Sequence, residues 1–396
     1  MGGVVALRYK IYAFFAVELI LSLFSMPALA ADVAVAGFAF SGDFSTAAAR
    51  FPYSHQLFER LRADPAGKNL SRLIVERSAT VANSAISLLP GDAMLNLKKS
   101  DQALITVLVL TGETVLTENF GSYYKTFVNL RGDALIFDYK SKTVVRSYPI
   151  NAALFDATPS SPDAGRIAGF IEQLLLKEEG KGLLTQYVNR LASATLPAPG
   201  QRTIQIRRVQ VAPEALAMMP EALRSQPQLM DSMVNDAFAS VLSAKAGVPL
   251  LPSKAGDALG KMSLRLENND QIDLHVGEGD YVFDVTLNKF AKIKTAETAV
   301  ATSYVYGAYA HVQFSEPLLN SNFLDTDLKN GETAVLPTGR IGTDDFAAYQ
   351  DALRGMFLKL TAAFDGGDMK WIRTAAAAKD IEKQLEATRV ILKASK

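Results

Sequence analysis

The sequence contains no cysteine among its 396 residues. This absence excludes disulfide bonds, cysteine nucleophiles, and zinc or iron–sulfur sites that are built from cysteine. It also excludes the lipid anchor of bacterial lipoproteins, which needs a cysteine at the start of the mature chain. The stability of the fold must therefore come from an apolar core, and a hydrophobic content of 49% is enough to form one.

The sequence also lacks an excess of charge of either sign, because it has 41 basic and 41 acidic residues. A general nucleic-acid-binding protein usually carries a basic excess. We therefore expect no nucleic-acid partner.

Histidine is scarce, and the three histidines, His55, His275 and His311, share no metal-binding spacing. The segment GDALGKMS, Gly256 to Ser263, resembles a phosphate-binding loop. It has three residues between its glycines where the motif needs four, and Met262 follows its lysine where the motif needs Ser or Thr. There is also no G-x-S-x-G elbow. We predict no catalytic residue, no metal and no cofactor, and therefore a protein that is not an enzyme.

The N-terminus has the pattern of a secretory signal peptide. Two basic residues precede an apolar run from Ile11 to Phe24, which contains one charge, Glu18. The tripeptide Ala28-Leu29-Ala30 then matches an A-x-A cleavage site. We predict that residues 1–30 are removed, that the mature chain begins at Ala31, and that it is released into the periplasm without a stable membrane anchor. The alternative is an uncleaved anchor helix, for which the apolar run is short.

Two segments share an unusual spacing of large apolar residues. VAVAGFAF, residues 33–40, alternates on one face and changes phase across Gly37, which predicts a β-bulge. TIQIRRVQV, residues 203–211, repeats the same spacing at an offset of 171 residues. Buried strands at 103–110 and 281–287 recur at an offset of about 177 residues. The chain is therefore predicted to contain a duplicated unit.

Each unit is expected to end in an amphipathic helix, the first around 167–175 and the second around 346–364, with Thr343 as the N-cap of the second. The predicted fold class is α+β, with two tandem α/β sandwich units, each a mixed or antiparallel sheet packed with helices. The units are assigned to residues 31–195 and 202–366. The linker LPAPGQ, 196–201, separates them, and residues 367–396 form a C-terminal helix.

An aromatic cluster, Tyr304, Tyr306, Tyr309 and His311, lies in one predicted strand. Strand alternation places Tyr304 and Tyr306 on one face and Tyr309 and His311 on the other. One interpretation is an interaction face, since tyrosine suits half-wet surfaces. The other is that one face packs on a helix and the other lies at a domain interface.

The C-terminal segment from Thr374 to Lys393 is predicted to be one helix with mixed charges and an apolar stripe. It would pack on its own domain, or dock on a membrane surface or a partner.

The first half resembles the α/β domain shared by the amino-terminal domain of TolB and the curli secretion protein CsgG. VAVAGFAF resembles the opening strand of that domain, LIVER (73–77) its second strand, SDQALITVLVL (100–110) a long strand, and VNLRGDALIFDYKSKTVVRSYP (128–149) its last hairpin. The resemblance covers about residues 33–176. It implies a soluble periplasmic interaction module. The missing cysteine departs from the curli proteins, which are lipoproteins.

Three hypotheses for function follow. The first is a non-enzymatic periplasmic accessory or scaffold protein for envelope assembly, secretion or cell-surface organisation, which contacts unidentified envelope proteins. The second is a carrier that holds a lipophilic small molecule between a sheet and its helices. The third is an enzyme whose site is assembled across the two halves.

Overall fold

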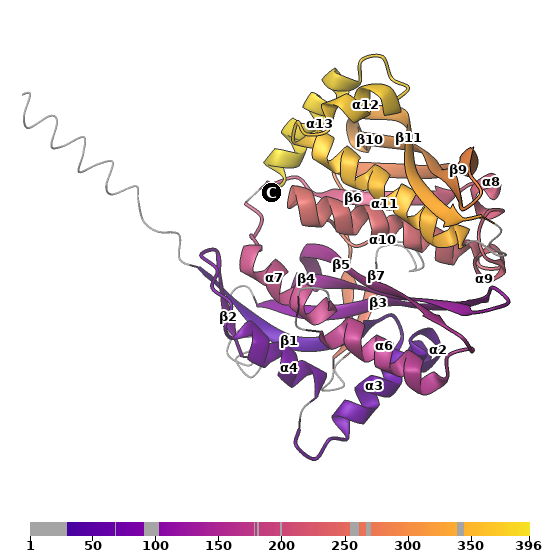
Figure 1. Ribbon diagram of the computed structural model, residues 1–396. Coiled ribbons are helices and arrows are strands. Elements are labelled where there is room, and N and C mark those ends of the chain that lie inside the picture. Colours follow the sequence, from indigo (N-terminus) through magenta and orange to yellow (C-terminus); the bar gives the residue numbers. More distant parts are fainter. Residues whose placement is uncertain are drawn as a thin grey trace, which may run out of the picture.

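The computed structural model describes residues 30–67, 69–90, 103–177, 179, 182–198, 200–253, 261–266, 271–338 and 344–396. These residues form two β-sheets packed against helices, which confirms the α+β class. Two helices, α10 (Pro227–Ala246) and α11 (Asp345–Phe364), lie between the sheets (Figure 1). Of the residues predicted for the signal peptide and its cleavage, Ala28 lies outside the described part of the chain, whereas Ala31 begins the first strand.

The first sheet is built on four strands in the order β1-β3-β4-β5. β1 pairs in parallel with β3, and β3, β4 and β5 form an antiparallel meander. One face is covered by four helices. The strands are β1 (Ala31–Ser41), β3 (Leu104–Asn119), β4 (Tyr124–Asp138) and β5 (Thr143–Thr158), and the helices are α3 (Pro52–Arg62), α4 (Leu70–Ser78), α6 (Ala164–Leu176) and α7 (Leu183–Ser193).

The second sheet has the same order and directions, β6-β9-β10-β11. Its strands are β6 (Ile204–Val211), β9 (Tyr281–Glu297), β10 (Ala301–Glu316) and β11 (Ser321–Pro337). The parallel register shifts between Val35 and Gly37 in β1 and between Ile206 and Arg208 in β6. The bulge that the apolar spacing predicted is therefore present in both halves.

Gly37 shows why the bulge in β1 needs glycine. Its φ is +97°, and a Cβ atom placed there would lie 2.3 Å from Cβ of Ser71 in α4. The Ser71 hydroxyl accepts a hydrogen bond from the Phe38 amide at 3.1 Å. The bulge thus turns a backbone donor toward α4 and brings the helix close to the strand.

A hairpin from the second half joins the first sheet. β8 (Gln271–His275) lies beside β5, and β7 (Lys261–Leu266) pairs with both β8 and β1, which closes the strands into a ring. Apolar side chains from these strands fill the ring, among them Val107, Phe137 and Leu264. Residues 261–266 and 271–275, assigned to the second unit from the sequence, therefore build the first sheet, and the two halves are joined by main-chain hydrogen bonds.

Two sequence assignments are wrong. LIVER lies in helix α4 rather than in a strand: the Asn69 side chain caps the helix by accepting from the Arg72 amide at 2.8 Å, and Leu70 and Ile74 are buried at helical spacing. The N-cap of α11 is Asp344, whose carboxylate accepts from the Ala347 amide at 3.1 Å. Thr343, the predicted cap, lies outside the described residues.

The predicted C-terminal helix is two helices, α12 (Met369–Ala375) and α13 (Ile381–Ala394). Between them the alanine run is extended along β11: Ala377 donates to the Asp327 carbonyl at 2.9 Å and Ala378 to the Thr326 hydroxyl at 3.1 Å. Pairing with the sheet thus overrides the high helix propensity of alanine. Ile372 and Leu385 are buried, so both helices pack on their own half.

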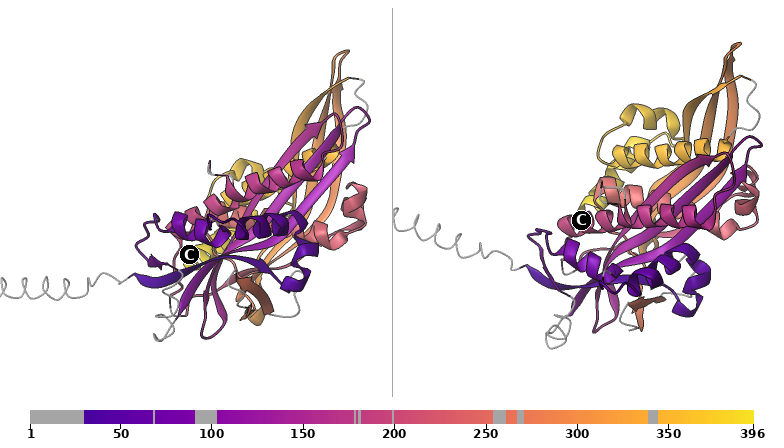
Figure 2. Two further views of the ribbon diagram at one scale, coloured as in Figure 1. Left: turned by 90° about the horizontal axis from the view of Figure 1, so that it is seen from below. Right: turned by 60° about the horizontal axis from the view of Figure 1, so that its bottom comes forward.

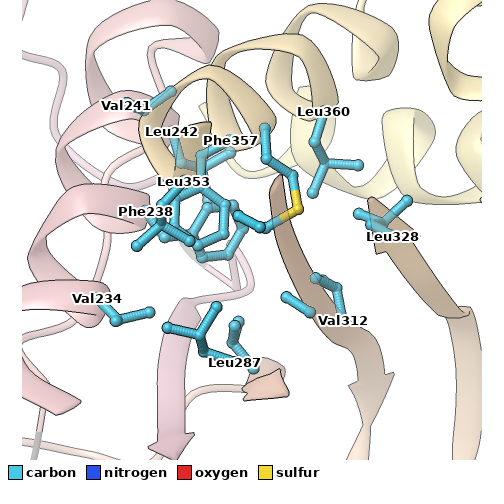
Figure 3. Packing of buried hydrophobic residues seen from close by; sticks show 14 of the residues in the cluster. Val234, Phe238, Val241, Leu242, Leu287, Val312, Leu328, Leu353, Phe357 and Leu360 are labelled. Atoms are coloured by element: carbon cyan, nitrogen blue, oxygen red, sulfur yellow. The ribbon is translucent and has the colours of Figure 1, made fainter. Parts of the chain in front are cut away.

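The largest core lies between the second sheet and the two central helices (Figure 3). The Phe238 ring of α10 lies 5.2 Å from that of Phe283 in β9 and 4.9 Å from that of Phe357 in α11. Short elements complete the described chain: β2 (Ile86–Leu89), α2 (Ala47–Arg50), α8 (Pro213–Leu216), α9 (Glu221–Arg224), and 3-10 turns at Phe44–Thr46 and Pro317–Leu319. None of the helices in the described ranges is long and apolar enough to cross a membrane.

Candidate interaction surface

The structure divides the predicted aromatic face. Tyr306 is 1% exposed, and its hydroxyl donates to Oδ1 of Asp345 at the start of α11, at 2.6 Å. Tyr304 is half-buried on the same side, where the Lys292 ammonium lies 4.6 Å from its ring centroid. Tyr306 therefore packs toward α11 and is not accessible to a partner, which removes it from the predicted interaction face, whereas Tyr304 stays half-exposed beside it.

Tyr309 and His311 point to the opposite side of the second sheet, which we call the outer face. Both are half-buried, and neither belongs to a hydrophobic core formed by the described residues. The helices α10 and α11 lie on the other side of this sheet, and the ends of β9, β10 and β11 project past them (Figure 2). The outer face is thus not the domain interface that the sequence left open as an alternative.

The strand register orders the outer face into rows that run across β9, β10 and β11. One row is Lys289, Tyr309 and Lys329, the next is Ala291, Gly307 and Gly331, and the third is Ile293, Val305 and Thr333. A shallow pocket of about 220 Å³ lies over these rows, bounded at the β11 edge by Thr374 and Ala375 of α12. The row of Lys289, Tyr309 and Lys329 therefore forms one side of the pocket, and the row that contains Ile293 and Val305 forms the other. The row of Ala291, Gly307 and Gly331 forms the floor of the pocket between them, which carries no large side chain.

The glycines of the floor let the neighbouring side chains lean inward. A Cβ atom at Gly307 would lie 3.1 Å from Cε2 of Tyr309, and one at Gly331 would lie 3.0 Å from Cγ1 of Val305. The Lys289 ammonium is 5.1 Å from the Tyr309 ring centroid, within the range of a cation–π contact. The ring is thereby held against the sheet with one edge toward the pocket.

Beyond Tyr309 the outer face becomes acidic. Nδ1 of His311 lies 3.0 Å from Oδ1 of Asp327, and its Nε2 lies 3.4 Å from Oδ1 of Asp325. Both ring nitrogens thus meet a carboxylate. The outer face therefore changes along the strands. It is aliphatic near the turn between β9 and β10, carries lysine and tyrosine in the row of Tyr309, and is acidic around His311.

The three histidines lie on three different elements. His55 lies on α3, His275 on β8 and His311 on β10. Within the described ranges, no group of three His, Cys, Asp or Glu residues is placed to hold a metal ion. Gly256 to Gly260, the start of the rejected phosphate-loop match, lie outside those ranges.

β11 forms the edge of the second sheet. The Asp327 carbonyl accepts from the Ala377 amide, and the Asp325 amide donates to Oε1 of Gln384 at 2.9 Å. The backbone N–H and C=O groups of both residues therefore point outward in the plane of the sheet, away from β10. Backbone direction alternates along a strand, and the register of β11 with β10 is unbroken from Leu324 to Pro337. The N–H and C=O groups of residues 329, 331, 333 and 335 therefore also point outward.

A second polar cluster lies between the first sheet and α10. Nη1 of Arg131 is 3.0 Å from Oδ2 of Asp236, and the Ser147 hydroxyl donates to Asp133 at 2.8 Å. Burial raises the pKa of Asp133 to about 7, with the nearby Asp236 carboxylate adding to the rise and the Ser147 hydrogen bond opposing it. These groups tie the two halves together and are mostly buried, so they are not offered to a partner.

Sequence reasoning missed Lys289, Lys329 and the glycine pair of the outer face. The segment SNFLDTDLKNGETAVLP carries Asp325, Asp327 and Lys329 at alternate positions, and each is preceded by a residue of the other face, Leu324, Thr326 and Leu328. This alternation indicates a strand with one polar face. It does not indicate which residues of β9 and β10 lie beside them, because that depends on the register.

Comparisons with known proteins leave the family open. No protein-family model matches the chain, and no curated protein matches its sequence. Among solved structures, the chain is similar to a protein of family DUF330 from Xanthomonas campestris, with a TM-score of 0.21 and 13% identity. The match covers 43% of this chain and 87% of that protein. A similarity at this level carries no argument about fold or function, and the resemblance to the TolB and CsgG domain stays a prediction.

Proposed function

We propose that this chain is a non-enzymatic, exported accessory or scaffold protein of the cell envelope that works through protein–protein contacts. The observation that carries the proposal is the outer face of the second sheet. The inner face of that sheet is packed against α10 and α11, whereas the outer face leaves tyrosine, lysine and aliphatic side chains accessible.

The composition of the outer face suits a protein partner. Ile293 is 54% exposed and Val335 is 63% exposed, and they lie on the same face as Tyr309. Neighbouring exposed apolar residues indicate an interaction site more strongly than isolated ones do. Tyrosine is enriched in interfaces because its ring is apolar and its hydroxyl forms hydrogen bonds.

Export is supported by the N-terminal sequence and by the position of the first strand. β1 begins at Ala31, the residue after the predicted cleavage site, so removal of residues 1–30 would leave the described fold intact. N-terminal sequencing of the protein from the periplasmic fraction should give Ala31 as the first residue. A start elsewhere, or recovery only from the cytoplasm, would contradict export.

The carrier hypothesis would need an apolar cavity between a sheet and its helices. In the second half that space is occupied by packed side chains such as Phe238, Phe283 and Phe357. We therefore favour the protein-binding function.

Site-specific photo-crosslinking in intact cells tests the proposal. A photoreactive residue at Thr333 should give an adduct of defined mass with an envelope protein. The same residue at Asn189, which is exposed on α7 far from the outer face, should not give that adduct. Identical products from both positions, or none from Thr333, would count against the proposal.

A further inference from the structure

The exposed edge of β11 carries a more specific inference, which rests on the proposed function. We propose that residues Lys329–Val335 accept an extended segment of a partner protein as an added strand. The segment would carry a large apolar residue beside Gly331 and, at its end near Ala375, an acidic residue within reach of the Lys329 side chain. Addition of a strand to a sheet edge is a common way of binding peptides.

The backbone of β11 is already used in this way by the chain itself. The Ala377 amide donates to the Asp327 carbonyl at 2.9 Å, and Ala376 and Leu328 form an antiparallel bridge. This contact covers the edge up to the Lys329 amide, which the bridge places against the Ala375 carbonyl. A partner strand would continue the same pairing along the next residues of β11.

The part of the β11 edge that is open to a partner has a limit at each end. The segment Ala376–Ala378 blocks the edge on one side, and Pro337, which has no N–H group, ends it on the other. The outward-pointing residues between them are Lys329, Gly331, Thr333 and Val335. The Leu328–Ala376 bridge places the Lys329 amide against the Ala375 carbonyl, so the amides of Gly331, Thr333 and Val335 and the carbonyls of all four residues remain. No backbone partner for these remaining groups is found within the described ranges. The stretch from Lys329 to Val335 is about 20 Å long, and an added strand of about five or six residues would cover the part beyond Ala375.

The charges beside the edge select the partner. Lys329 is exposed, and neither Lys329 nor Lys289 forms an ion pair with a described carboxylate. Ala375 occupies the position directly opposite Lys329, so a carboxylate at the end of the added strand would be reached diagonally by the long Lys329 side chain on the outer face. Asp325 and Asp327 lie further along β11 and would repel an acidic residue that shifted toward them. Attraction to Lys329 and repulsion by Asp325 and Asp327 together fix the position of the segment along β11.

The shape of the outer face selects the neighbouring side chain. Gly331 and Gly307 leave the pocket floor open at the position next to the added strand, with Val305 on one side and Tyr309 on the other. A large apolar side chain opposite Gly331 would cover this floor, as aromatic residues often do beside glycine in sheets. Thr333 and Val335 favour β-branched residues opposite them.

The test uses the full chain and two blocked peptides, TDTFTVT and its reversed sequence TVTFTDT, so that either strand direction is sampled. Binding is measured by fluorescence anisotropy of the labelled peptides. One of the two should bind in a saturable way, and the same peptide with lysine in place of aspartate should bind at least about threefold more weakly, with the difference shrinking in high salt. Equal binding of the aspartate and lysine peptides would overturn the charge assignment.

A matched pair of variants tests the strand addition. Thr333→Pro removes one outward N–H group at an edge position that tolerates proline, whereas Thr333→Val keeps that group and the size of the side chain. Proline should weaken peptide binding about tenfold or more, which is about 1.4 kcal/mol, and valine should leave it within about twofold. Both variants should keep the circular dichroism spectrum and the melting temperature within a few degrees. If the proline variant unfolds, Lys329→Glu replaces it and should reverse the preference between the aspartate and lysine peptides.

Three results would overturn the inference. The first is binding that is unchanged by Thr333→Pro and by Lys329→Glu. The second is a dimer of this chain that becomes monomeric with Thr333→Pro, since the occupant would then be a second copy. Crosslinking from Thr333 to an envelope protein, together with failure of the peptides, would retain the proposed function and reject this binding mode.

Discussion

At the scale of single residues, Asp133 is the most informative ionisable group. It is 8% exposed between β4 and α10, and burial raises its pKa to about 7. An unfolded chain releases this proton near the ordinary pKa of 3.8. The folded state therefore holds a proton that the unfolded state has lost between about pH 4 and pH 7. The stabilisation is complete below this range and is lost as the pH rises through it.

We predict that Asp133→Asn makes the stability less dependent on pH. From pH 5 to pH 8 the wild-type chain should lose on the order of 2 kcal/mol through this carboxyl, at about 1.4 kcal/mol per pKa unit. Asparagine stays neutral and removes this loss. Urea unfolding at the two pH values measures the effect, and an unchanged difference in the variant would refute it.

Gly112 supports the Arg131–Asp236 ion pair by leaving room for the guanidinium. A Cβ atom at Gly112 would lie 2.1 to 2.4 Å from the Arg131 guanidinium. Gly112→Ala should displace the arginine from a buried carboxylate and lower the free energy of unfolding by about 2–4 kcal/mol.

Gly169→Ala is the control, because Gly169 is exposed in the middle of α6 with no atom within 4 Å. There alanine should stabilise by up to about 1 kcal/mol. Chemical denaturation compares the two, and a similar change in both would contradict this account.

At the scale of elements, helix α3 is capped from outside its own sequence. The Glu113 carboxylate on β3 accepts from the amides of Tyr53 at 3.0 Å and Ser54 at 2.8 Å. A carboxylate at a helix N-terminus satisfies unpaired donors and interacts favourably with the helix dipole. The helix is thereby fixed to the sheet.

Glu113→Ala should cost about 1–2 kcal/mol, as the loss of a helix cap does. The control is Glu172→Ala, which removes an exposed ion pair with Arg60 of 2.6 Å and should cost less than about 0.5 kcal/mol. Thermal unfolding ranks the two variants. Equal destabilisation would show that the cap contributes no more than a surface ion pair.

Sequence patterns predicted elements well where the apolar spacing was local. The bulged strands, β3, β10 and the closing helices follow from residues a few positions apart. The failures came from distant contacts. Residues 376–378 are extended because β11 offers main-chain partners, and strands β7 and β8 leave their own half because β1 and β5 have edges to pair with.

Only part of the candidate surface could be predicted, because alternation within one strand can be seen in the sequence whereas contacts between strands cannot. Strand alternation placed Tyr309 and His311 on the face opposite to Tyr306, and the structure agrees. The lysines beside Tyr309 come from two other strands, so only the register reveals them. Alternation also does not tell which strand lies at the edge of a sheet.

At the scale of the whole molecule, the two sheets repeat one strand order but end differently. The first sheet is closed into a ring by β7 and β8, through pairs of β7 with β1 and of His275 in β8 with Thr143 in β5. The second sheet ends at β11, whose edge is covered only in part by residues 376–378 among those described. A long edge left open is a liability unless it serves a partner.

Amide-resolved hydrogen exchange of the isolated protein tests whether the edge of β11 is open. We predict alternation along the end of β11: the amides of Gly331, Thr333 and Val335 exchange fast, whereas those of Glu332 and Ala334, which point toward β10, are protected. Uniform protection of residues 331–335 would show that the edge is already paired and would contradict the account.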